Sequence, residues 1–230
     1  MRLLQSLCHL VLLANLTCAP ESLRADDGVD PALVRERALL GAFPNIGERR
    51  NDVLVINYRS GRRQVFESDP HACEMGDADN CHMHFVWDYD PHREILVVQN
   101  IEWEWVDYDL IDLASESSIT TATAPEPAPN ARIWAVVDHG VGPVAGEGSG
   151  EILLISQKDR KFRIIGQRYL PMCKFERWGT NLAFFVICGS YSNDPLEGEF
   201  RVAPGPDGTL ERMLTPRRVS DEEYRSILAP

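Results

Sequence analysis

The sequence predicts an all-β fold: a β-propeller-like array of about four small antiparallel blades, with short N- and C-terminal helices. Short apolar segments recur along the chain and are separated by turn residues, which is typical of strands in antiparallel sheets. Four turns each join two such segments, at irregular intervals that approximate one four-stranded blade. These turns are 59–61, 114–116, 157–159 and 205–208. An irregular β-sandwich or barrel is the alternative that this pattern leaves open.

The N-terminal residues 1–25 have the layout of a secretory signal peptide. Arg2 precedes an apolar stretch, and polar and small residues follow up to the preferred cleavage point after Ala25. A buried N-terminal helix is the alternative. We therefore expect a signal peptide over 1–25 and a single β-propeller-like domain over 26–230, in an exported protein of the periplasm or the secreted fraction. No later segment is apolar and long enough to form a membrane span.

The net charge of the chain indicates which kinds of partner it favours. Removal of residues 1–25 takes away Arg2, Arg24 and Glu21, and leaves 21 basic and 34 acidic side chains, a net charge of −13. Such a surface repels nucleic acid and anionic lipid, and it attracts cationic molecules in a salt-dependent way. The expected partner is a basic protein, and nucleic acid is not expected.

Helix signals stand at the two ends of the expected domain. Asp30 is the expected N-cap and Pro31 the first helical residue of a short helix that Gly41 ends. Ser220 and Glu223 form a capping box, which predicts a final short helix.

The segments between these helices alternate between strands and turns. Residues 53–58 and 63–68 are expected to pair as a hairpin. In the acidic stretch 94–113, the apolar residues change parity between Trp105 and Val106. Strand side chains alternate with a period of two, so this change predicts a β-bulge or a tight turn there.

Four cysteines follow the signal peptide, and an even number in an exported chain indicates disulfides. Cys73 and Cys81 bracket a loop rich in turn residues, and Cys173 and Cys188 lie in two segments expected to be neighbouring strands. Among the three connectivities, the sequence favours the local pairs Cys73–Cys81 and Cys173–Cys188.

The segment 71–84, HACEMGDADNCHMH, also has the composition of a metal site. Its histidines are ligands that zinc or copper takes. Pairing of the cysteines would leave only His71, His82 and His84, with Asp77 or Asp79, as a weak surface site. The expectation is therefore a disulfide-closed loop without a cofactor, and zinc or copper is the alternative.

The segment 85–113 is both acidic and aromatic, with eight carboxylates against one arginine. Carboxylates steer a cationic protein toward a surface, and aromatic side chains anchor it there. The alternative is a solvated sheet face whose tryptophans lie in the core. The expected partner-binding residues are Trp87, Asp88, Asp90, Glu102, Trp103, Glu104, Asp107 and Asp109.

Three segments carry a resemblance to a known family: VWDYDPHREILVV (86–98), DYDLIDLASESSITT (107–121) and PEPAPNARIWAVV (125–137). They resemble the bacterial exported propeller-like repeat proteins, in which a strand runs to a D-L-A-S-type turn and the next blade opens with a proline-led apolar strand. Glu116 stands where that family usually has glycine. The resemblance covers about half of the chain and implies a fold, not an activity.

Catalytic signatures are absent from the sequence, which contains neither G-x-S-x-G nor H-E-x-x-H. Asp138 and His139, before a glycine-rich stretch, form the most site-like pair, although neighbours on a strand point to opposite faces. The sequence therefore favours an exported protein-binding domain, such as an envelope inhibitor or toxin-immunity protein that captures a basic partner. A metal-binding protein or metal-dependent hydrolase that uses the His71/His82/His84 loop is the alternative.

Overall fold

The computed structural model describes residues 30–129, 132–139, 150–170, 172–189, 198–205 and 209–214. The predicted signal peptide and the predicted C-terminal helix lie outside these residues. Every helix and strand below belongs to the unit Pro31–Pro230.

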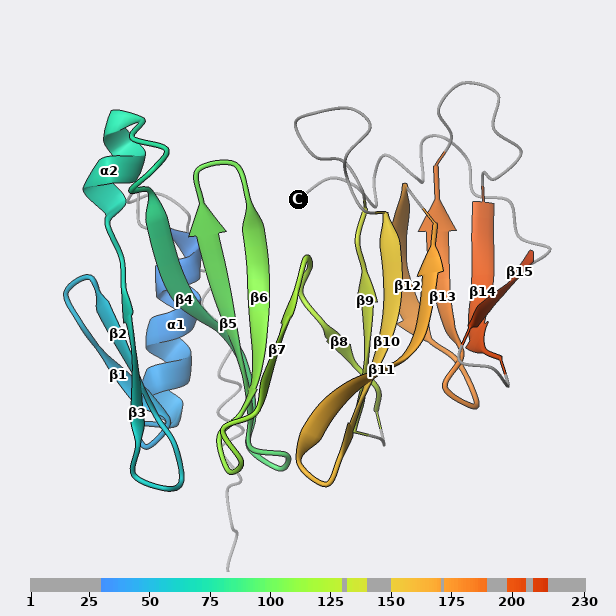
Figure 1. Cartoon of the computed structure of the whole chain (residues 1–230), viewed down its shortest axis with the longest axis horizontal. Helices are drawn as coiled ribbons and strands as arrows, with labels where there is room; N and C mark the ends of the chain where they lie inside the picture. Colours follow the sequence, from blue (N-terminus) through green and yellow to red (C-terminus); the bar gives the residue numbers. More distant parts are fainter. Residues whose placement is uncertain are drawn as a thin grey trace, which may run out of the picture. The chain divides into compact units, whose positions relative to one another are not determined.

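Strands dominate the described chain and form four antiparallel sheets (Figure 1). In each sheet, strands that follow one another in sequence are neighbours, so every sheet is built by successive hairpins. The first sheet contains β1 (Gly47–Arg50), β2 (Val53–Asn57) and β3 (Arg63–Glu67). The second contains β4 (His82–Asp90), β5 (Ile95–Glu102), β6 (Val106–Asp112) and β7 (Ser118–Thr121).

The third sheet contains β8 (Glu126–Pro127), β9 (Ile133–Val137), β10 (Glu151–Lys158) and β11 (Lys161–Tyr169). The fourth contains β12 (Cys173–Trp178), β13 (Phe184–Cys188), β14 (Gly198–Pro204) and β15 (Leu210–Leu214). The predicted all-β class and the small antiparallel sheets are thus confirmed, including the hairpin of 53–58 with 63–68, which pairs as β2 and β3.

The four predicted turns hold equivalent places, because each joins the last two strands of one sheet. The turn at 157–159 is centred on Asp159 and Arg160, which have φ angles of 52° and 60°. Two successive residues at positive φ are the mark of a type I′ hairpin turn, whose twist matches that of the strands it joins. The turn at 205–208 is described only at 205.

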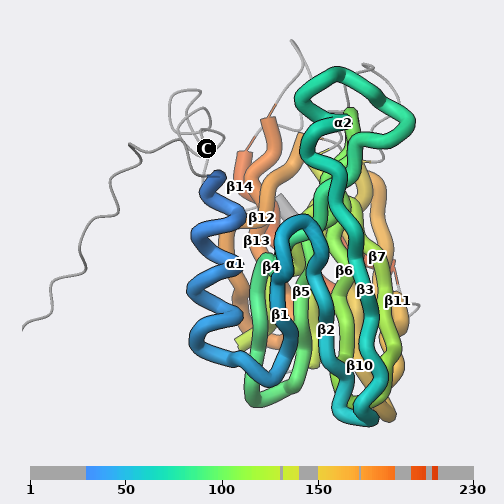
Figure 2. Tube along the Cα trace, turned by 90° about the vertical axis from the view of Figure 1, so that its left-hand side faces the viewer, coloured from blue at the N-terminus to red at the C-terminus, as the bar shows by residue number. Residues whose placement is uncertain are grey.

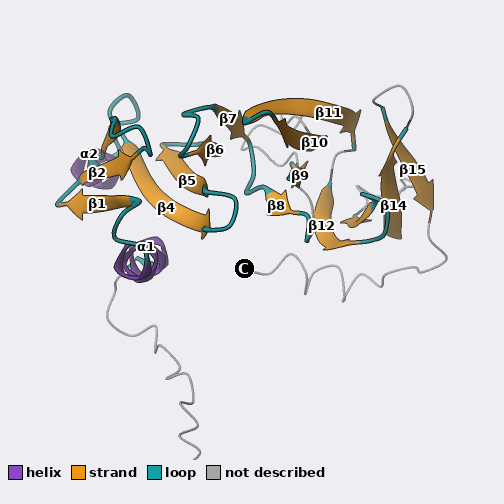
Figure 3. Ribbon diagram, turned by 90° about the horizontal axis from the view of Figure 1, so that it is seen from below, coloured by secondary structure: helices purple, strands orange, loops and turns teal. Residues whose placement is uncertain are grey.

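Helix α1 (Pro31–Ala42) begins at Pro31 as predicted, but it does not end at Gly41. The helix runs through Gly41 to Ala42, and the amide of Phe43 still donates to the carbonyl of Leu39, 2.9 Å away. The predicted stop was therefore one residue too early. Figure 2 shows α1 along the first and second sheets, and in Figure 3, seen from below, it lies beside β1 and β4.

A second helix, α2 (Pro70–Met75), stands where the sequence led us to expect a loop. Asp69 caps its N-terminus by accepting a hydrogen bond from the amide of Ala72 at 2.9 Å, and Gly76 ends it with a φ of 75°. The Asp-Pro start and the glycine stop are the same signals that identified α1.

The change of parity near Trp105 marks a tight turn and not a bulge. Strand β5 ends at Glu102 and β6 begins at Val106, and the Glu102 amide donates to the Trp105 carbonyl at 2.8 Å. The turn between these strands holds Trp103 and Trp105 outside the core. The irregular register of the second sheet lies instead between Val86 and Asp88 of β4.

Buried side chains connect each sheet to the next. One apolar cluster joins α1 and the first sheet to the second, with Leu54, Ile56, Leu96 and Ile111 at or below 1% exposure. A second joins the second sheet to Trp134 of β9, and a third joins the third and fourth sheets. Continuous burial of this kind is the main stabilising term of the fold.

Candidate protein-binding site

The eight predicted partner-binding residues all lie on the second sheet, in β4, in β6 or around the β5–β6 turn. The structure separates them into two groups. Trp87, Asp88 and Asp90 occupy the end of β4, whereas Glu102, Trp103, Glu104, Asp107 and Asp109 lie at or near the β5–β6 turn.

The β4 group has structural partners. The guanidinium of Arg35 in α1 stacks 3.9 Å from the centre of the Trp87 ring, and Tyr108 meets that ring edge-on at 5.5 Å. Asp88 is exposed and accepts a hydrogen bond from the amide of Tyr89 at 2.8 Å. These contacts place Trp87 between α1 and the second sheet.

Asp90 holds the turn between β4 and β5. Its carboxylate accepts hydrogen bonds from the amides of His92 and Arg93, at 2.9 and 3.0 Å, and pairs with the Arg93 guanidinium. Burial acts to raise the pKa of the Asp90 carboxyl, but the hydrogen bonds from Arg93 and His92 and the arginine charge outweigh it and leave the pKa below its ordinary value. These groups stabilise a local turn.

The turn group forms an exposed surface together with α2. The exposed fractions are 47% for Trp103, 59% for Trp105, 42% for Val106 and 71% for Met75, which ends α2. A methyl group built on Gly76 would lie 3.4 Å from Cη2 of Trp103, so the tryptophan ring packs over the end of α2. Trp103 thus brings the β5–β6 turn into contact with α2, although the two segments are far apart in sequence.

Acidic residues flank these apolar residues in the sequence. Neither 69–84 nor 100–109 contains a lysine or an arginine. We define the acidic aromatic patch as these apolar residues with the exposed acidic residues of the same two segments: Met75, Trp103, Trp105, Val106, Glu74, Asp77, Asp79, Glu102 and Glu104. The predicted partner-binding residues include Trp103, Glu102 and Glu104 of this patch. Met75 was missed because α2 was not expected, and Trp105 and Val106 were missed because their exposure depends on the turn between β5 and β6.

A chain of hydrogen bonds crosses the second sheet beside the patch. His84 of β4 contacts Asn100 of β5 through Nδ1 and Oδ1, 2.8 Å apart. The Asn100 amide donates to Asp107 at 2.7 Å and to Asp109 at 3.1 Å, and the hydroxyl of Thr120 in β7 donates to Asp109 at 2.6 Å. This chain fixes the strand ends that carry the β5–β6 turn.

The pKa of the Asp107 carboxyl in this chain is raised above its ordinary value. Burial raises the pKa of the Asp107 carboxyl, the negative charges of Asp109 and Glu102 raise it further, and the hydrogen bond from Asn100 opposes them. The carboxylates here thus repel one another, which is the condition that a cationic partner would relieve.

The three histidines of the predicted metal loop are not assembled into a site. His71 is exposed on α2, His82 and His84 lie on β4 with ring centres 6.0 Å apart, and His84 is bonded to Asn100. Within the described ranges, no group of three or more His, Cys, Asp or Glu residues has a geometry that could hold a metal ion. Zinc or copper at this loop stays an untested alternative.

Both predicted disulfides are formed. Cys73 in α2 is bonded to Cys81, one residue before β4, with Cα atoms 4.4 Å apart. Cys173 of β12 is bonded to Cys188, its direct partner in β13. The local pairing that the sequence favoured is therefore the correct one.

Removal of the first disulfide should loosen the α2 part of the patch. The bond closes eight residues of sequence separation, a loop for which the chain-entropy model gives a stabilisation of about 2.5 kcal/mol. We expect the double variant Cys73→Ala, Cys81→Ala to lose about that much unfolding free energy, measured by urea denaturation. Hydrogen exchange should rise in 70–81 and stay unchanged in β9 and β10. An equal rise in all strands would contradict a local role.

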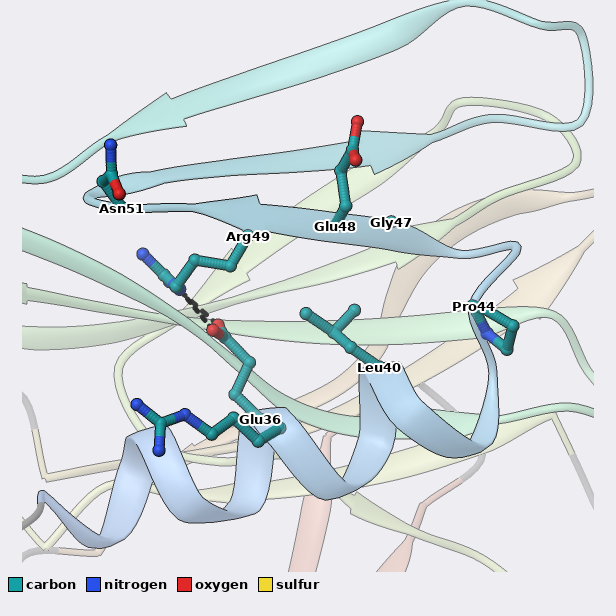
Figure 4. A pocket seen from close by; sticks show the side chains of 8 residues that line it. Glu36, Leu40, Pro44, Gly47, Glu48, Arg49 and Asn51 are labelled. Atoms are coloured by element: carbon teal, nitrogen blue, oxygen red, sulfur yellow. Dashed lines mark hydrogen bonds and ion pairs between the residues drawn. The ribbon is translucent and has the colours of Figure 1, made fainter.

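A pocket of about 630 Å³ lies between α1 and β1 (Figure 4). Its principal charged groups are already paired, because Glu36 binds Arg49 through both carboxylate oxygens and also accepts the amide of Val86 at 2.9 Å. Arg49 in turn donates to the carbonyl of His84. We therefore assign this charge pair to joining α1 with the first two sheets.

No helix in the described part of the chain is long and apolar enough to cross a membrane. Comparison with protein-family models, with curated proteins and with solved structures found no significant match to this chain. The candidate site therefore rests on its own geometry: two exposed tryptophans in the β5–β6 turn, of which Trp103 packs over the end of a disulfide-closed helix, in two segments that contain no lysine or arginine.

Proposed function

We propose that this protein is an exported binding domain that captures a basic protein partner through the acidic aromatic patch, as an envelope inhibitor or toxin-immunity protein does. The observation that carries the proposal is the position of Trp103 and Trp105, two large aromatic side chains held in solvent among carboxylates. Large aromatic side chains that are exposed in the free protein gain the free energy of burial only when a partner covers them.

The distribution of exposed apolar groups supports this assignment. Seven large hydrophobic side chains are exposed in the described chain, and four of them lie in the patch. The other three, Val65, Ile164 and Tyr169, lie on β3 and β11. The surrounding carboxylates would speed the encounter with a cationic protein and select against acidic ones.

The architecture suits a binding role, and we propose that the four sheets are the blades of a propeller-like array. Support comes from the consecutive order of strands in each sheet and from the equivalent places of the four turns. The two disulfides are compatible with export to the periplasm or beyond.

The proposal is tested by capture of a defined partner. The immobilised protein is exposed to envelope extract over a salt series, the retained basic proteins are identified by mass spectrometry, and the affinity of each is measured with purified material. We expect the double variant Trp103→Ser, Trp105→Ser to weaken binding by about thirtyfold or more, the cost of one aromatic hot spot. The double variant Glu102→Lys, Glu104→Lys should slow association and flatten its salt dependence.

Matched controls alter the same residue types outside the patch. Ile164→Ser with Tyr169→Ser removes two exposed apolar groups from β11, and Glu67→Lys with Glu211→Lys reverses two exposed charges on β3 and β15. Both controls should leave affinity and salt dependence unchanged. Retention of no basic protein, or equal affinity of the patch variants and the parent protein, would overturn the proposed function.

A further inference from the structure

The pocket of about 630 Å³ between α1 and β1 has a polar end and an apolar end. Figure 4 shows Arg49 and Asn51 toward one end of it, and Leu40 and Pro44 toward the other. Arg37 also lines the pocket, and it neighbours Leu40 on the helix surface because the two are three residues apart. The volume is within the range of small-molecule sites, roughly 300–1,000 Å³, which place a few polar groups beside an apolar wall.

Arg49 lines this pocket with part of its guanidinium unused. Its Nε and Nη2 donate to the two carboxylate oxygens of Glu36, and Nη2 also donates to the carbonyl of His84. Nη1 donates to no other described group. It is not sealed from solvent either, because the only buried side-chain nitrogen or oxygen without a partner in the described ranges is Nε1 of Trp178. Only 16% of the Arg49 side chain is exposed, so Nη1 is held in place with its two N–H groups open to a ligand.

The pocket also contains an arginine that has no ion-pair partner among the described residues. Glu36 and Arg49 neutralise each other. The side chain of Glu48 lies on the side of β1 away from the helix and pairs with Arg50 at 2.5 Å (Figure 4). Arg37 is exposed and makes no hydrogen bond or ion pair within the part of the chain that the structure describes. In a chain with a net charge of −12, a pocket lined by an uncompensated arginine selects an anionic ligand.

We propose that this pocket binds a small organic carboxylate with an apolar tail. The carboxylate accepts hydrogen bonds from Nη1 of Arg49 and pairs with the guanidinium of Arg37, since the planar guanidinium matches the geometry of a carboxylate. Asn51 borders the same end with a carboxamide donor, and the tail lies along Leu40 and Pro44. The apolar end favours this class over inorganic phosphate or sulfate, which would leave it uncovered.

This site shares no residue with the acidic aromatic patch and does not depend on the proposed capture of a protein. The bond from Arg49 to Glu36 has a structural role, and the same bond orients the guanidinium so that Nη1 remains available. A positioned donor of this kind loses little conformational entropy when a ligand binds.

The test is calorimetric titration of the whole oxidised protein with two carboxylates, hexanoate and 3-phenylpropanoate. Each is compared with the alcohol that lacks its charge, hexan-1-ol or 3-phenylpropan-1-ol. Acetate, which lacks the tail, and inorganic phosphate complete the set. We expect at least one of the two carboxylates to bind in the millimolar range or tighter. Its alcohol, acetate and phosphate should each bind about tenfold more weakly or worse, because each lacks either the charge-assisted hydrogen bonds or the apolar contact.

A variant and a spectroscopic measurement locate the ligand. Arg37→Gln should weaken binding of the carboxylate about tenfold and leave binding of its alcohol unchanged. Arg63→Gln changes an exposed arginine of β3 outside the pocket and is the matched control, which should have no effect. In heteronuclear NMR spectra, the carboxylate should shift the guanidinium resonances of Arg49 and the backbone amide resonances of Leu40 and Asn51, and leave those of β9 and β10 in place.

Four results would each overturn the inference: no binding by either carboxylate, an alcohol or phosphate that binds as tightly, indifference to Arg37→Gln, or resonance shifts that spare α1 and β1. Variants of the acidic aromatic patch should leave these titrations unchanged. Failure of this inference is therefore distinguishable from failure of the proposed function.

Discussion

Replacement of Asp112 by alanine is expected to lower the free energy of unfolding by about 3 kcal/mol. The side chain is fully buried at the end of β6, where it accepts hydrogen bonds from the amides of Ala114 and Ser115, at 2.8 and 3.1 Å. Its other partners are Gln157, at 2.6 Å, and Arg160, at 3.1 Å, both from the β10–β11 hairpin. The variant would leave the buried amide of Gln157 without this acceptor. Urea denaturation followed by circular dichroism measures the loss.

Two further variants make this prediction specific. Asp112→Asn keeps an oxygen for the two turn amides but loses the charge that pairs with Arg160, so its loss of stability should be intermediate. Asp79→Ala removes an exposed carboxylate from the disulfide loop and should change stability by less than about 0.5 kcal/mol. A loss below about 1 kcal/mol for Asp112→Ala would show that the buried carboxylate does not hold the second and third sheets together.

Replacement of Glu36 by alanine is expected to cost about 4 kcal/mol. Glu36 is fully buried in α1 and pairs with Arg49 of β1, whose side chain is 16% exposed (Figure 4). Its carboxylate also accepts a hydrogen bond from the amide of Val86 in β4. The variant leaves a largely buried guanidinium without its counter-charge and a buried amide without its acceptor. The melting temperature should fall, and the near-ultraviolet circular dichroism of Trp87, which stacks on Arg35 of the same helix, should weaken.

A double variant tests the cause of that loss. Glu36→Leu with Arg49→Met removes both charges and keeps most of the side-chain volume, and we expect it to recover more than half of the stability lost in Glu36→Ala, because a buried ion pair is often replaceable by apolar groups. The amide of Val86 and the carbonyl of His84 would still lose their partners, so recovery should be incomplete. A double variant as unstable as Glu36→Ala would show that the uncompensated charge is not the main cost.

Local signals account for the parts of the fold that the sequence predicted. The Cys73–Cys81 loop and the strand pair that joins Cys173 to Cys188 are set by residues near one another in sequence. Hairpin turns are likewise local, and all four predicted turns proved to join the last two strands of a sheet. Helix α2 carried a usable signal in Asp69 and Gly76, but the turn residues between Cys73 and Cys81 favoured a disulfide-closed loop there.

The candidate site was only partly predictable, for reasons of geometry. Alternating glutamate and tryptophan at 102–105 fits both a continued strand and a turn, and only the pairing of Ile101 with Val106 decides between them. Whether a tryptophan faces the core or solvent then depends on that register. The stacking of Arg35 on Trp87 and the packing of Trp103 over Gly76 join distant parts of the chain. Such contacts cannot be predicted from the periodicity of apolar residues or from secondary-structure propensities.

The disulfide between Cys73 and Cys81 affects the conformational entropy that binding at α2 would cost. A helix of six residues is too short to persist in water by itself, and this one is closed covalently and covered at its end by Trp103. The proposed partner would therefore bind a preorganised surface, and α2 would lose little conformational entropy when the complex forms. In a reducing compartment the disulfide would open and α2 would lose this constraint, so the capture proposed above would be confined to oxidising compartments.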